Sequence, residues 1–199
     1  DIALRVADRY RSRLPSFNDD IQGTGAVALA GVLSSGRLTG ARLAEQRIVV
    51  HGAGAAGLGI ARQLKAAMRL EGLDEPQCLE RVAALDSRGL IVADHEQSDA
   101  YKRELAWPIN LAHELGLGAT ADRGLESVVR AFRPTVLIGT SGQRGCFTED
   151  VVRAMARSCE RPVILPSGEE KRDANGQVVM EKVADAGDSG IYLRGSSKS

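Results

Sequence analysis

The order of apolar and polar residues along this chain predicts strands that alternate with helices. A β-branched run, Ile48-Val49-Val50, leads into a glycine-rich turn. Beyond the turn, apolar residues recur at helical spacing: Leu58, Ile60, Ala61 and Leu64. A short continuous apolar run is typical of a buried strand, and the second pattern is typical of a helix with one apolar face. A strand, a glycine turn and a helix in this order predict one unit of an open parallel sheet.

Similar patterns predict more elements on both sides of this unit. Helices are expected at residues 1–14, at 26–33, at 121–132 and after Thr148, which is a suitable N-cap. Strands are expected at 81–89, from Thr135 onward and at 161–166. The stretch 71–76 is expected to be a loop, and the polar stretch 93–110 to be mostly solvated helix and loop. We therefore predict an α/β fold, a Rossmann-like, doubly wound and mostly parallel sheet with helices on both faces.

Composition supports this class and narrows the expected partners. The 199 residues are 43% hydrophobic but only 4% aromatic, which fits a core of Ala, Val, Leu and Ile in a helix-covered sheet. The 26 basic and 26 acidic residues give a formal net charge of zero. Without a basic excess, no electrostatic attraction to nucleic acid or to an anionic membrane is expected. Small molecules or other protein are therefore the expected partners.

Cysteine usage and the start of the chain bear on location and completeness. The three cysteines, Cys78, Cys146 and Cys159, have neither a disulfide-type nor a metal-type spacing. No signal-peptide layout and no apolar run of membrane length are visible, so a reducing cytoplasm is the expected location. The chain starts at Asp1, without Met and inside an amphipathic pattern, which suggests a piece of a longer protein.

The glycine turn is the main candidate for chemistry. Gly52, Gly54 and Gly57 have the spacing of dinucleotide-binding turns. In such turns the first glycine allows a tight bend, the second lets the backbone approach a pyrophosphate, and the third lets the helix pack on its strand. Ala55 and Ala56 complete the candidate cofactor site at the start of the helix, where free N–H groups favour an anion. The alternative is a packing turn that binds nothing.

An acidic residue at the end of the next strand extends this hypothesis. Dinucleotide domains place such a residue roughly 20 positions after the glycines, where it bonds the adenosine ribose hydroxyls. Asp86, with its neighbour Ser87, is the candidate, although it follows Gly57 at a longer distance. A simple turn residue at the strand end is the alternative. Lys102 and Arg103 could instead meet a 2′-phosphate, which would make the cofactor NADP.

A second loop of small residues follows the strand that starts at Thr135. Loops after parallel strands are where these folds bind ligands, so Thr140, Ser141 and Gly142 are candidates to line the nicotinamide half of the cofactor. An ordinary strand-to-helix turn is the alternative. His51, beside the glycine turn, is expected to sit at a strand end rather than to act as a base.

Two adjacent carboxylates, Asp19 and Asp20, lie in a polar turn before an apolar helix. One interpretation is helix capping, in which side-chain oxygens accept the free N–H groups of the first turn. The other is a divalent-metal site, because Mg²⁺ and Mn²⁺ prefer carboxylate oxygens. Two neighbouring carboxylates cannot close such a site, so further ligands would have to come from elsewhere.

Three segments, taken together, resemble the malic enzymes. They are residues 17–31, residues 52–61, and residues 138–148 with the following Arg161-Pro162-Val163-Ile164. The resemblance covers roughly residues 1–166. The first segment is the most specific, and it is similar to the metal segment of the family. By this resemblance, Asp20 would ligate Mg²⁺ or Mn²⁺ and Asp19 would support the catalytic centre.

The resemblance implies an activity and an organisation. Malic enzymes oxidise L-malate with NAD or NADP, decarboxylate the bound oxaloacetate to pyruvate, and usually assemble as dimers or tetramers. The family's lysine base, tyrosine acid and two other carboxylate ligands would precede Asp1, so this chain is expected to bind cofactor but not to turn over malate alone. The expected division is 1–20, the end of the catalytic domain with the metal segment; 21–166, the NAD(P)-binding domain; and 167–199, a divergent tail.

The chain departs from the family after Ile164, where a Ser-Asn-Pro segment is expected and Pro166-Ser167-Gly168 stands instead. This departure keeps open a second hypothesis, a non-catalytic nucleotide-binding or interaction module. A third hypothesis is the cofactor domain of an amino-acid dehydrogenase, in which Asp20 has no role. The resemblance does not decide between NAD and NADP.

Overall fold

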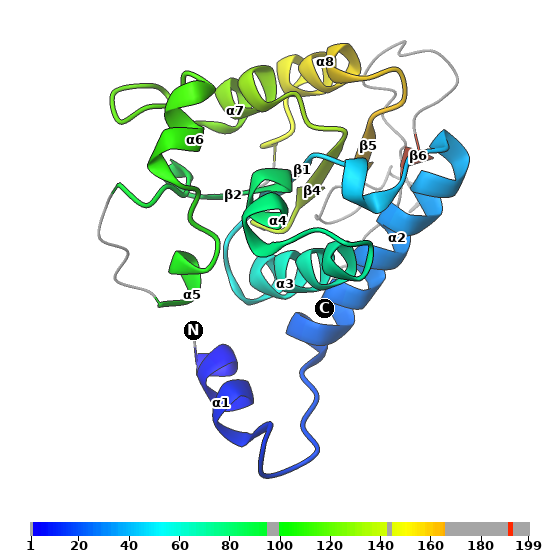
Figure 1. Cartoon of the computed structure of the whole chain (residues 1–199), viewed down its shortest axis with the longest axis vertical. Coiled ribbons are helices and arrows are strands. Elements are labelled where there is room, and N and C mark those ends of the chain that lie inside the picture. The colour runs from blue at the N-terminus through cyan, green and yellow to red at the C-terminus, as the bar shows by residue number, and fades with distance from the viewer. Residues whose placement is uncertain (1, 95–99, 143–144, 166–190, 193–199) are drawn as a thin grey trace, which may run out of the picture.

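A computed structural model of the protein describes residues 2–94, 100–142, 145–165 and 191–192, and its centre is a six-stranded sheet in the order β3-β2-β1-β4-β5-β6 (Figure 1). The strands are β1 (Ile48–His51), β2 (Val82–Asp86), β3 (Gly89–Leu90), β4 (Val136–Gly139), β5 (Val163–Leu165) and β6 (Ile191–Tyr192). Every neighbouring pair is parallel except β2 and β3, which are antiparallel. The predicted Rossmann-like, mostly parallel sheet is therefore confirmed.

The central strand β1 marks the place where the chain reverses its direction across the sheet. β1 lies between β2 and β4, with Ile48 opposite both Val82 and Val136. The chain first adds β2 and β3 on one side of β1, and then returns to add β4 and β5 on the other side. In open parallel sheets, the crevice at such a switch point, outside the carboxyl ends of the strands, is where ligands bind.

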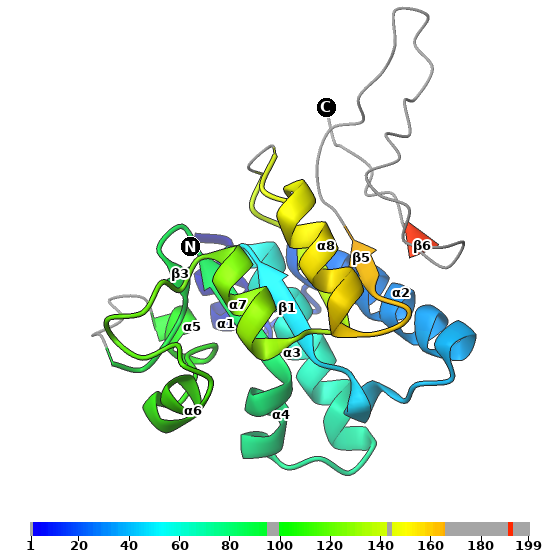
Figure 2. The same ribbon diagram turned by 90° about the horizontal axis from the view of Figure 1, so that it is seen from above.

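Helices cover both faces of the sheet (Figures 1 and 2). The helices are α1 (Ile2–Tyr10), α2 (Thr24–Thr39), α3 (Ala55–Leu70), α4 (Glu75–Arg81), α5 (Ala100–Arg103), α6 (Ile109–Glu114), α7 (Leu125–Phe132) and α8 (Glu149–Ser158), with two short turns, η1 (Asp19–Gly23) and η2 (Leu43–Glu45). Among the residues described, no helix is long and apolar enough to cross a membrane.

The alternation of side chains along β1 divides the core into two layers. Ile48 and Val50 pack with α2, α3 and α4, whereas Val49 points to the opposite face and packs with α6, α7 and α8. All three side chains are fully buried. Because successive strand residues point to opposite faces, a continuous apolar run is needed where both faces are covered. The continuous apolar run Ile48-Val49-Val50 therefore fits a strand that is covered by helices on both faces.

Several expected boundaries were wrong. The first helix ends at Tyr10 rather than near Pro15, and the second runs on to Thr39 rather than stopping near Leu33. The expected loop 71–76 already contains the start of α4, where the Asp74 side chain accepts a hydrogen bond from the Gln77 N–H at 2.8 Å. A proline in the first turn of a helix costs nothing, so Pro76 gave a false loop signal.

The expectation of a mostly solvated stretch at 93–110 was also wrong at its centre. Trp107 is fully buried, and Leu105 is nearly so. The Trp107 indole N–H donates to the Val82 carbonyl at 2.8 Å, and its ring packs edge-on against Phe132 with a centroid distance of 5.0 Å. The charged residues around Trp107 gave no sequence signal that its side chain is buried. The predicted tail 167–199 lies outside the described residues apart from β6.

Candidate nucleotide-binding site

The sequence-predicted cofactor residues come together at one edge of the sheet. The glycine turn follows β1, Asp86 ends β2, and Thr140 follows β4. Because β1, β2 and β4 are parallel neighbours, their carboxyl ends share one edge, and this edge contains the switch point between β1 and β4. The fold thus gathers three segments that are far apart in the sequence.

The glycine turn is packed too tightly for side chains at two of its three glycines. Gly52 has a φ of 122°, and a Cβ there would lie 2.6 Å from the Ser141 nitrogen. A Cβ at Gly57 would lie 1.8 Å from the Gly52 carbonyl oxygen. At Gly54, by contrast, a Cβ would meet nothing within 4 Å. Two glycines therefore close the turn, and the third leaves open space beside the backbone.

The helix that leaves this turn presents its first N–H groups to that open space. Gly54 is the N-cap residue of α3, and it provides no side-chain cap. Ala55 and Ala56 are the first helical residues and are half-buried. The first N–H groups of a helix have no partner within it, and with the helix dipole they favour a bound anion. The arrangement suits a phosphate without any basic side chain.

The loop after β4 is joined directly to the glycine turn. The Thr140 hydroxyl donates to the Gly52 carbonyl at 2.8 Å, and the Thr140 N–H donates to the His51 carbonyl at 2.8 Å. Gly142 continues the loop with a φ of 65°. The sequence suggested Thr140 only as a cofactor-lining residue. Its bracing contact to Gly52 had no sequence signal beyond a small polar residue at a strand end.

Asp86 is a largely buried carboxylate with two strong partners. Its side chain is 9% exposed, and its two oxygens accept bonds from the Arg88 N–H at 2.8 Å and from the Lys102 ammonium at 2.5 Å. Burial pushes the pKa of Asp86 up, but the hydrogen bonds and charges of Lys102 and Arg88 outweigh it and hold the pKa below its usual value. Ser87 and Arg103 are exposed. From the sequence, Asp86 was interpreted as a contact to the ribose hydroxyls and Lys102 as a contact to the 2′-phosphate of NADP. In the structure the two side chains form an ion pair.

The predicted metal segment forms the short π-helical turn η1. Asn18 is its N-cap, and the Asn18 side-chain oxygen accepts the Ile21 N–H at 3.2 Å. Asp19 and Asp20 are both exposed. In the parts of the chain that the structure describes, no group of three or more His, Cys, Asp or Glu side chains could hold a metal ion. The two aspartates therefore offer carboxylate oxygens suited to Mg²⁺ or Mn²⁺ but not a complete site.

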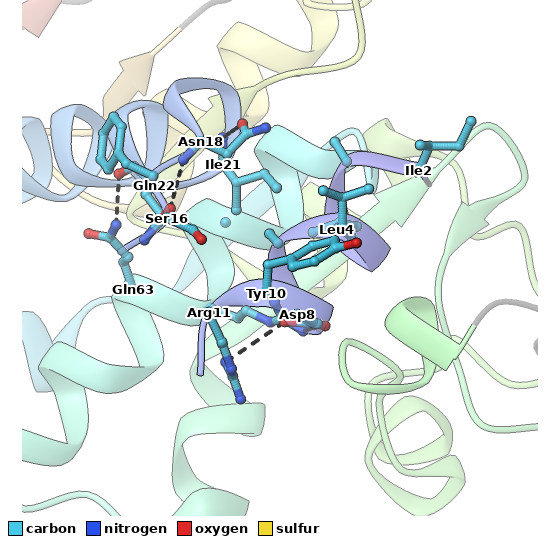
Figure 3. Close-up of a pocket in the computed structure, with 16 residues that line it drawn as sticks. Ile2, Leu4, Asp8, Tyr10, Arg11, Ser16, Asn18, Ile21, Gln22 and Gln63 are labelled. Atoms are coloured by element: carbon cyan, nitrogen blue, oxygen red, sulfur yellow. Dashed lines mark hydrogen bonds and ion pairs between the residues drawn. The ribbon is translucent and has the colours of Figure 1, made fainter. Parts of the chain in front are cut away.

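Close backbone packing fixes η1 against the cofactor helix. A Cβ at Gly59 of α3 would lie 2.2 Å from the Ile21 carbonyl oxygen. The Gln63 side chain donates to the Gln22 carbonyl at 2.8 Å, a contact seen in Figure 3. Gly25 of α2 crosses the same place, since its Cβ would lie 2.9 Å from the Gly59 carbonyl oxygen. Gly59 thus sets the distance between the aspartates and the glycine turn, although it lies outside the sequence motif.

We expect Gly59→Ala to loosen η1. The added methyl must push the Ile21 backbone away from α3, at a cost of about 1–3 kcal/mol. Hydrogen exchange should then show faster exchange at the amides of residues 19–23, and thermal unfolding should show lower stability. The control Ala66→Ser changes an exposed position of the same helix and should leave both unchanged. Unaltered exchange in Gly59→Ala would contradict this role for Gly59.

A groove of about 730 Å³ lies between α1, the segment 16–22 and α3 (Figure 3). Much of its lining is apolar and exposed: Ile2 is 78% exposed and Phe17 is 71% exposed. Gln22, Gln63 and Arg62 are among its polar lining residues. None of the glycine-turn residues Gly52, Gly54 or Gly57 lines this groove. This groove is therefore separate from the predicted cofactor residues.

His51 sits at the end of β1, where its Nδ1 is buried and has no hydrogen-bond partner among the described residues. Its ring lies 6.3 Å from that of Phe147. Burial lowers the pKa of His51 below its usual 6.5. At pH values just below 6.5 the unfolded chain binds this proton more readily than the folded chain does.

The pH dependence of stability should carry this signature. We expect stability to fall as the pH drops through about 6.5, and the loss to level off below the folded-state pKa. His51→Gln should reduce the fall, as measured by melting temperature at a series of pH values. His113→Gln, which alters an exposed histidine of α6, is the matched control and should keep the wild-type profile. Identical profiles for wild type and His51→Gln would contradict the assignment.

Comparison with known proteins agrees with this geometry. Residues 21–183 match the family model described as "Malic enzyme, NAD binding domain". The chain is 44% identical over 164 residues to the NAD-dependent malic enzyme of Sodalis glossinidius, and 43% identical over 164 residues to that of Pseudomonas aeruginosa. Both matches cover 82% of this chain but only 29% of the relative. The chain therefore spans less than a third of the length of these relatives.

A solved structure shares the fold. The malic enzyme from Pyrococcus horikoshii superposes with a TM-score of 0.66 at 24% identity, over 93% of this chain and 39% of that one. The family match continues past residue 166, where the resemblance read from the sequence stopped, and the boundaries at 20 and 166 stay predictions. Taken with the glycine turn and the parallel sheet, the match over residues 21–183 establishes that this chain belongs to the malic enzyme family, as its NAD-binding domain.

Proposed function

We propose that NAD binds in the crevice at the carboxyl ends of β1 and β4, with its pyrophosphate at the start of α3. The observation that carries this proposal is the open space beside Gly54, next to the free N–H groups of Ala55, Ala56 and Gly57. Gly52 supports it, because its positive φ turns the chain sharply enough to aim α3 at that space.

The two flanking segments would hold the two ends of the cofactor. Asp86, with Ser87, would accept hydrogen bonds from the adenosine ribose hydroxyls at the end of β2. Thr140, Ser141 and Gly142 would line the nicotinamide half beyond β4. NAD is the proposed cofactor because the curated relatives are named NAD-dependent malic enzymes. NADP remains the alternative, since Lys102 lies at hydrogen-bond distance from Asp86 and could meet a 2′-phosphate.

For the complete enzyme we propose oxidation of L-malate by NAD followed by decarboxylation to pyruvate. Asp20 would provide one ligand of Mg²⁺ or Mn²⁺, and Asp19 would support the catalytic centre beside it. A bound divalent cation would supply Lewis-acid polarisation of the substrate oxygen. The other ligands and the acid and base would come from the remainder of the enzyme, because the described residues supply no third ligand. This chain alone is therefore expected to bind cofactor without turnover.

The exposed apolar groove fits the same picture. Ile2, Val6 and Phe17 are each at least half exposed, and exposed apolar patches mark interaction surfaces. We assign the groove to contact with the catalytic portion of the complete enzyme. A dimer or tetramer in the cytoplasm is the proposed assembly and location, and the free thiols of Cys78, Cys146 and Cys159 are compatible with a reducing compartment.

Calorimetric titration of the purified chain with NAD and NADP, each with and without Mn²⁺, tests the proposal alongside a malate oxidation assay. Saturable NAD binding without malate turnover is the expected result. Failure to bind either nucleotide would overturn the proposal in favour of an interaction module. Binding together with oxidation of an amino acid instead of malate would favour the amino-acid dehydrogenase alternative.

A further inference from the structure

Helix α3, which begins at the glycine turn, also binds the segment around Glu104, which lies far along the chain. Arg62 of α3 donates to both carboxylate oxygens of Glu104, at 2.9 and 2.7 Å. One turn later, the Lys65 ammonium donates to the Glu104 carbonyl at 2.9 Å. Two-pronged arginine–carboxylate contacts fix orientation as well as distance. Arg62, Lys65 and Glu104 are called the α3 clamp below.

The α3 clamp is built more firmly than an ordinary surface ion pair. Lys65 is only 6% exposed, and its buried ammonium lies 3.8 Å from a Glu75 carboxylate oxygen in addition to holding the Glu104 carbonyl. Burying an ammonium group is costly unless it is hydrogen-bonded. The Arg62 guanidinium also lies 5.6 Å from the ring centroid of Tyr101, so it packs against a second residue of the same segment. The segment from Tyr101 to Glu104 is therefore tied to α3 at three points.

The residue inside this tethered segment is Lys102, which reaches Asp86. The Lys102 ammonium lies 2.5 Å from an Asp86 oxygen, and the Lys102 side chain is 27% exposed. A lysine side chain has four rotatable bonds and loses much freedom when it is held in one place. Holding its backbone in position reduces that loss. The α3 clamp thus connects α3 to the segment 101–104, and the Lys102–Asp86 pair connects that segment to the end of β2.

We propose that the α3 clamp, acting through Lys102, sets how strongly the adenosine ribose site discriminates against a 2′-phosphate. The proposal rests on the proposed NAD site, because it assigns Asp86 to the ribose. Alone, the Asp86 carboxylate would repel the negative charge of a 2′-phosphate. A lysine held beside it cancels that charge, so NADP is repelled less. Glu104 is accordingly a positioning residue for Lys102 and does not touch the cofactor.

The test compares Glu104→Ala with Glu126→Ala. Glu126 accepts two hydrogen bonds from Arg130 on α7, at 2.9 and 2.6 Å, across the sheet from α3. Glu126→Ala therefore removes a similar ion pair at a place away from the site. We expect Glu104→Ala to raise the dissociation constant of NADP about fivefold more than that of NAD, the size of one partly exposed charge pair. Glu126→Ala should change neither, and Glu104→Gln, which keeps an acceptor for Arg62, should recover part of the loss.

A double variant separates positioning from general damage. Lys102→Met should weaken NADP at least as much as Glu104→Ala, and combining the two should add nothing further. An additive double variant, or an equal loss of NAD and NADP in Glu104→Ala, would overturn the proposal. The pKa of Asp86, followed by NMR, should rise in Glu104→Ala as Lys102 loosens; an unchanged pKa would also overturn it. If the wild-type chain binds no nucleotide, the proposed function fails, and the Asp86 titration still decides whether the clamp positions Lys102.

Discussion

Gly57→Ala should destabilise the domain by about 3 kcal/mol and abolish detectable NAD binding. The new methyl carbon would lie 1.8 Å from the Gly52 carbonyl oxygen, well inside van der Waals contact. Relief requires α3 to move away from the turn or the turn to open. Either movement misplaces the N–H groups proposed to hold the pyrophosphate. Thermal unfolding and calorimetric titration with NAD measure the two effects.

Gly54→Ala is the matched control in the same turn. A Cβ there meets nothing within 4 Å, and Gly54 has a φ of −84°, which any residue adopts. We expect this variant to fold with wild-type stability but to bind NAD more weakly, because the methyl fills space proposed for the pyrophosphate. If Gly57→Ala melts like the wild type, the close packing of this turn is refuted. Unchanged NAD affinity in both variants would place the cofactor elsewhere.

Trp107→Ala should lower the free energy of unfolding by about 4 kcal/mol. The side chain is fully buried between β2 and α7, and its N–H bonds the Val82 carbonyl. Truncation leaves a large cavity and removes the donor from a buried carbonyl, and both effects destabilise the fold. Urea denaturation followed by circular dichroism measures the loss.

The surface control for this prediction is Leu70→Ala. Leu70 lies in the last turn of α3 and is 91% exposed, so its truncation should cost little. Trp107→Phe should be intermediate, because it keeps part of the ring volume but loses the hydrogen bond. A loss in Trp107→Ala no larger than that in Leu70→Ala would show that Trp107 does not anchor the segment between β3 and α6.

The sequence was sufficient to predict the class and the centre of the fold. The run Ile48-Val49-Val50 predicted a buried strand, and β1 is such a strand. The apolar spacing in the predicted helix 121–132 indicated α7, although α7 begins only at Leu125. Thr148 predicted the start of α8, where its hydroxyl accepts the Val151 N–H. These elements follow from local periodicity and capping, which a single sequence displays directly.

Elements held by distant contacts were not predictable in the same way. β3 is two residues long and exists because Gly89 and Leu90 pair with the end of β2. Trp107 sits among polar neighbours and is buried only by tertiary packing. The end of α1 at Tyr10 depends on a turn whose residues carry no strong stop signal before Pro15. Tertiary context decided the cases of β3 and Trp107, and one sequence does not show it.

The candidate site divides along the same line. The glycine spacing led directly to Gly52, Gly54 and Gly57, because close backbone packing requires glycine at Gly52 and Gly57, and Gly54 leaves open space beside the backbone. Nothing in the spacing indicated that Gly59 meets Ile21, or that Glu104 is held by α3, since these contacts join segments that only the fold brings together. The pairing of Lys102 with Asp86 was likewise invisible, although both residues had been singled out.

The most direct test of the central claim is to map NAD binding onto the backbone by amide NMR. Titration of the isotopically labelled chain with NAD should shift the amides of Gly52 to Gly57, the loop at 140–142 and the end of β2 at Asp86. The groove beside α1 should be unaffected, which makes the Ile2 and Val6 amides an internal control. Shifts centred on that groove, or no shifts at saturating NAD, would contradict a cofactor site at the switch point between β1 and β4.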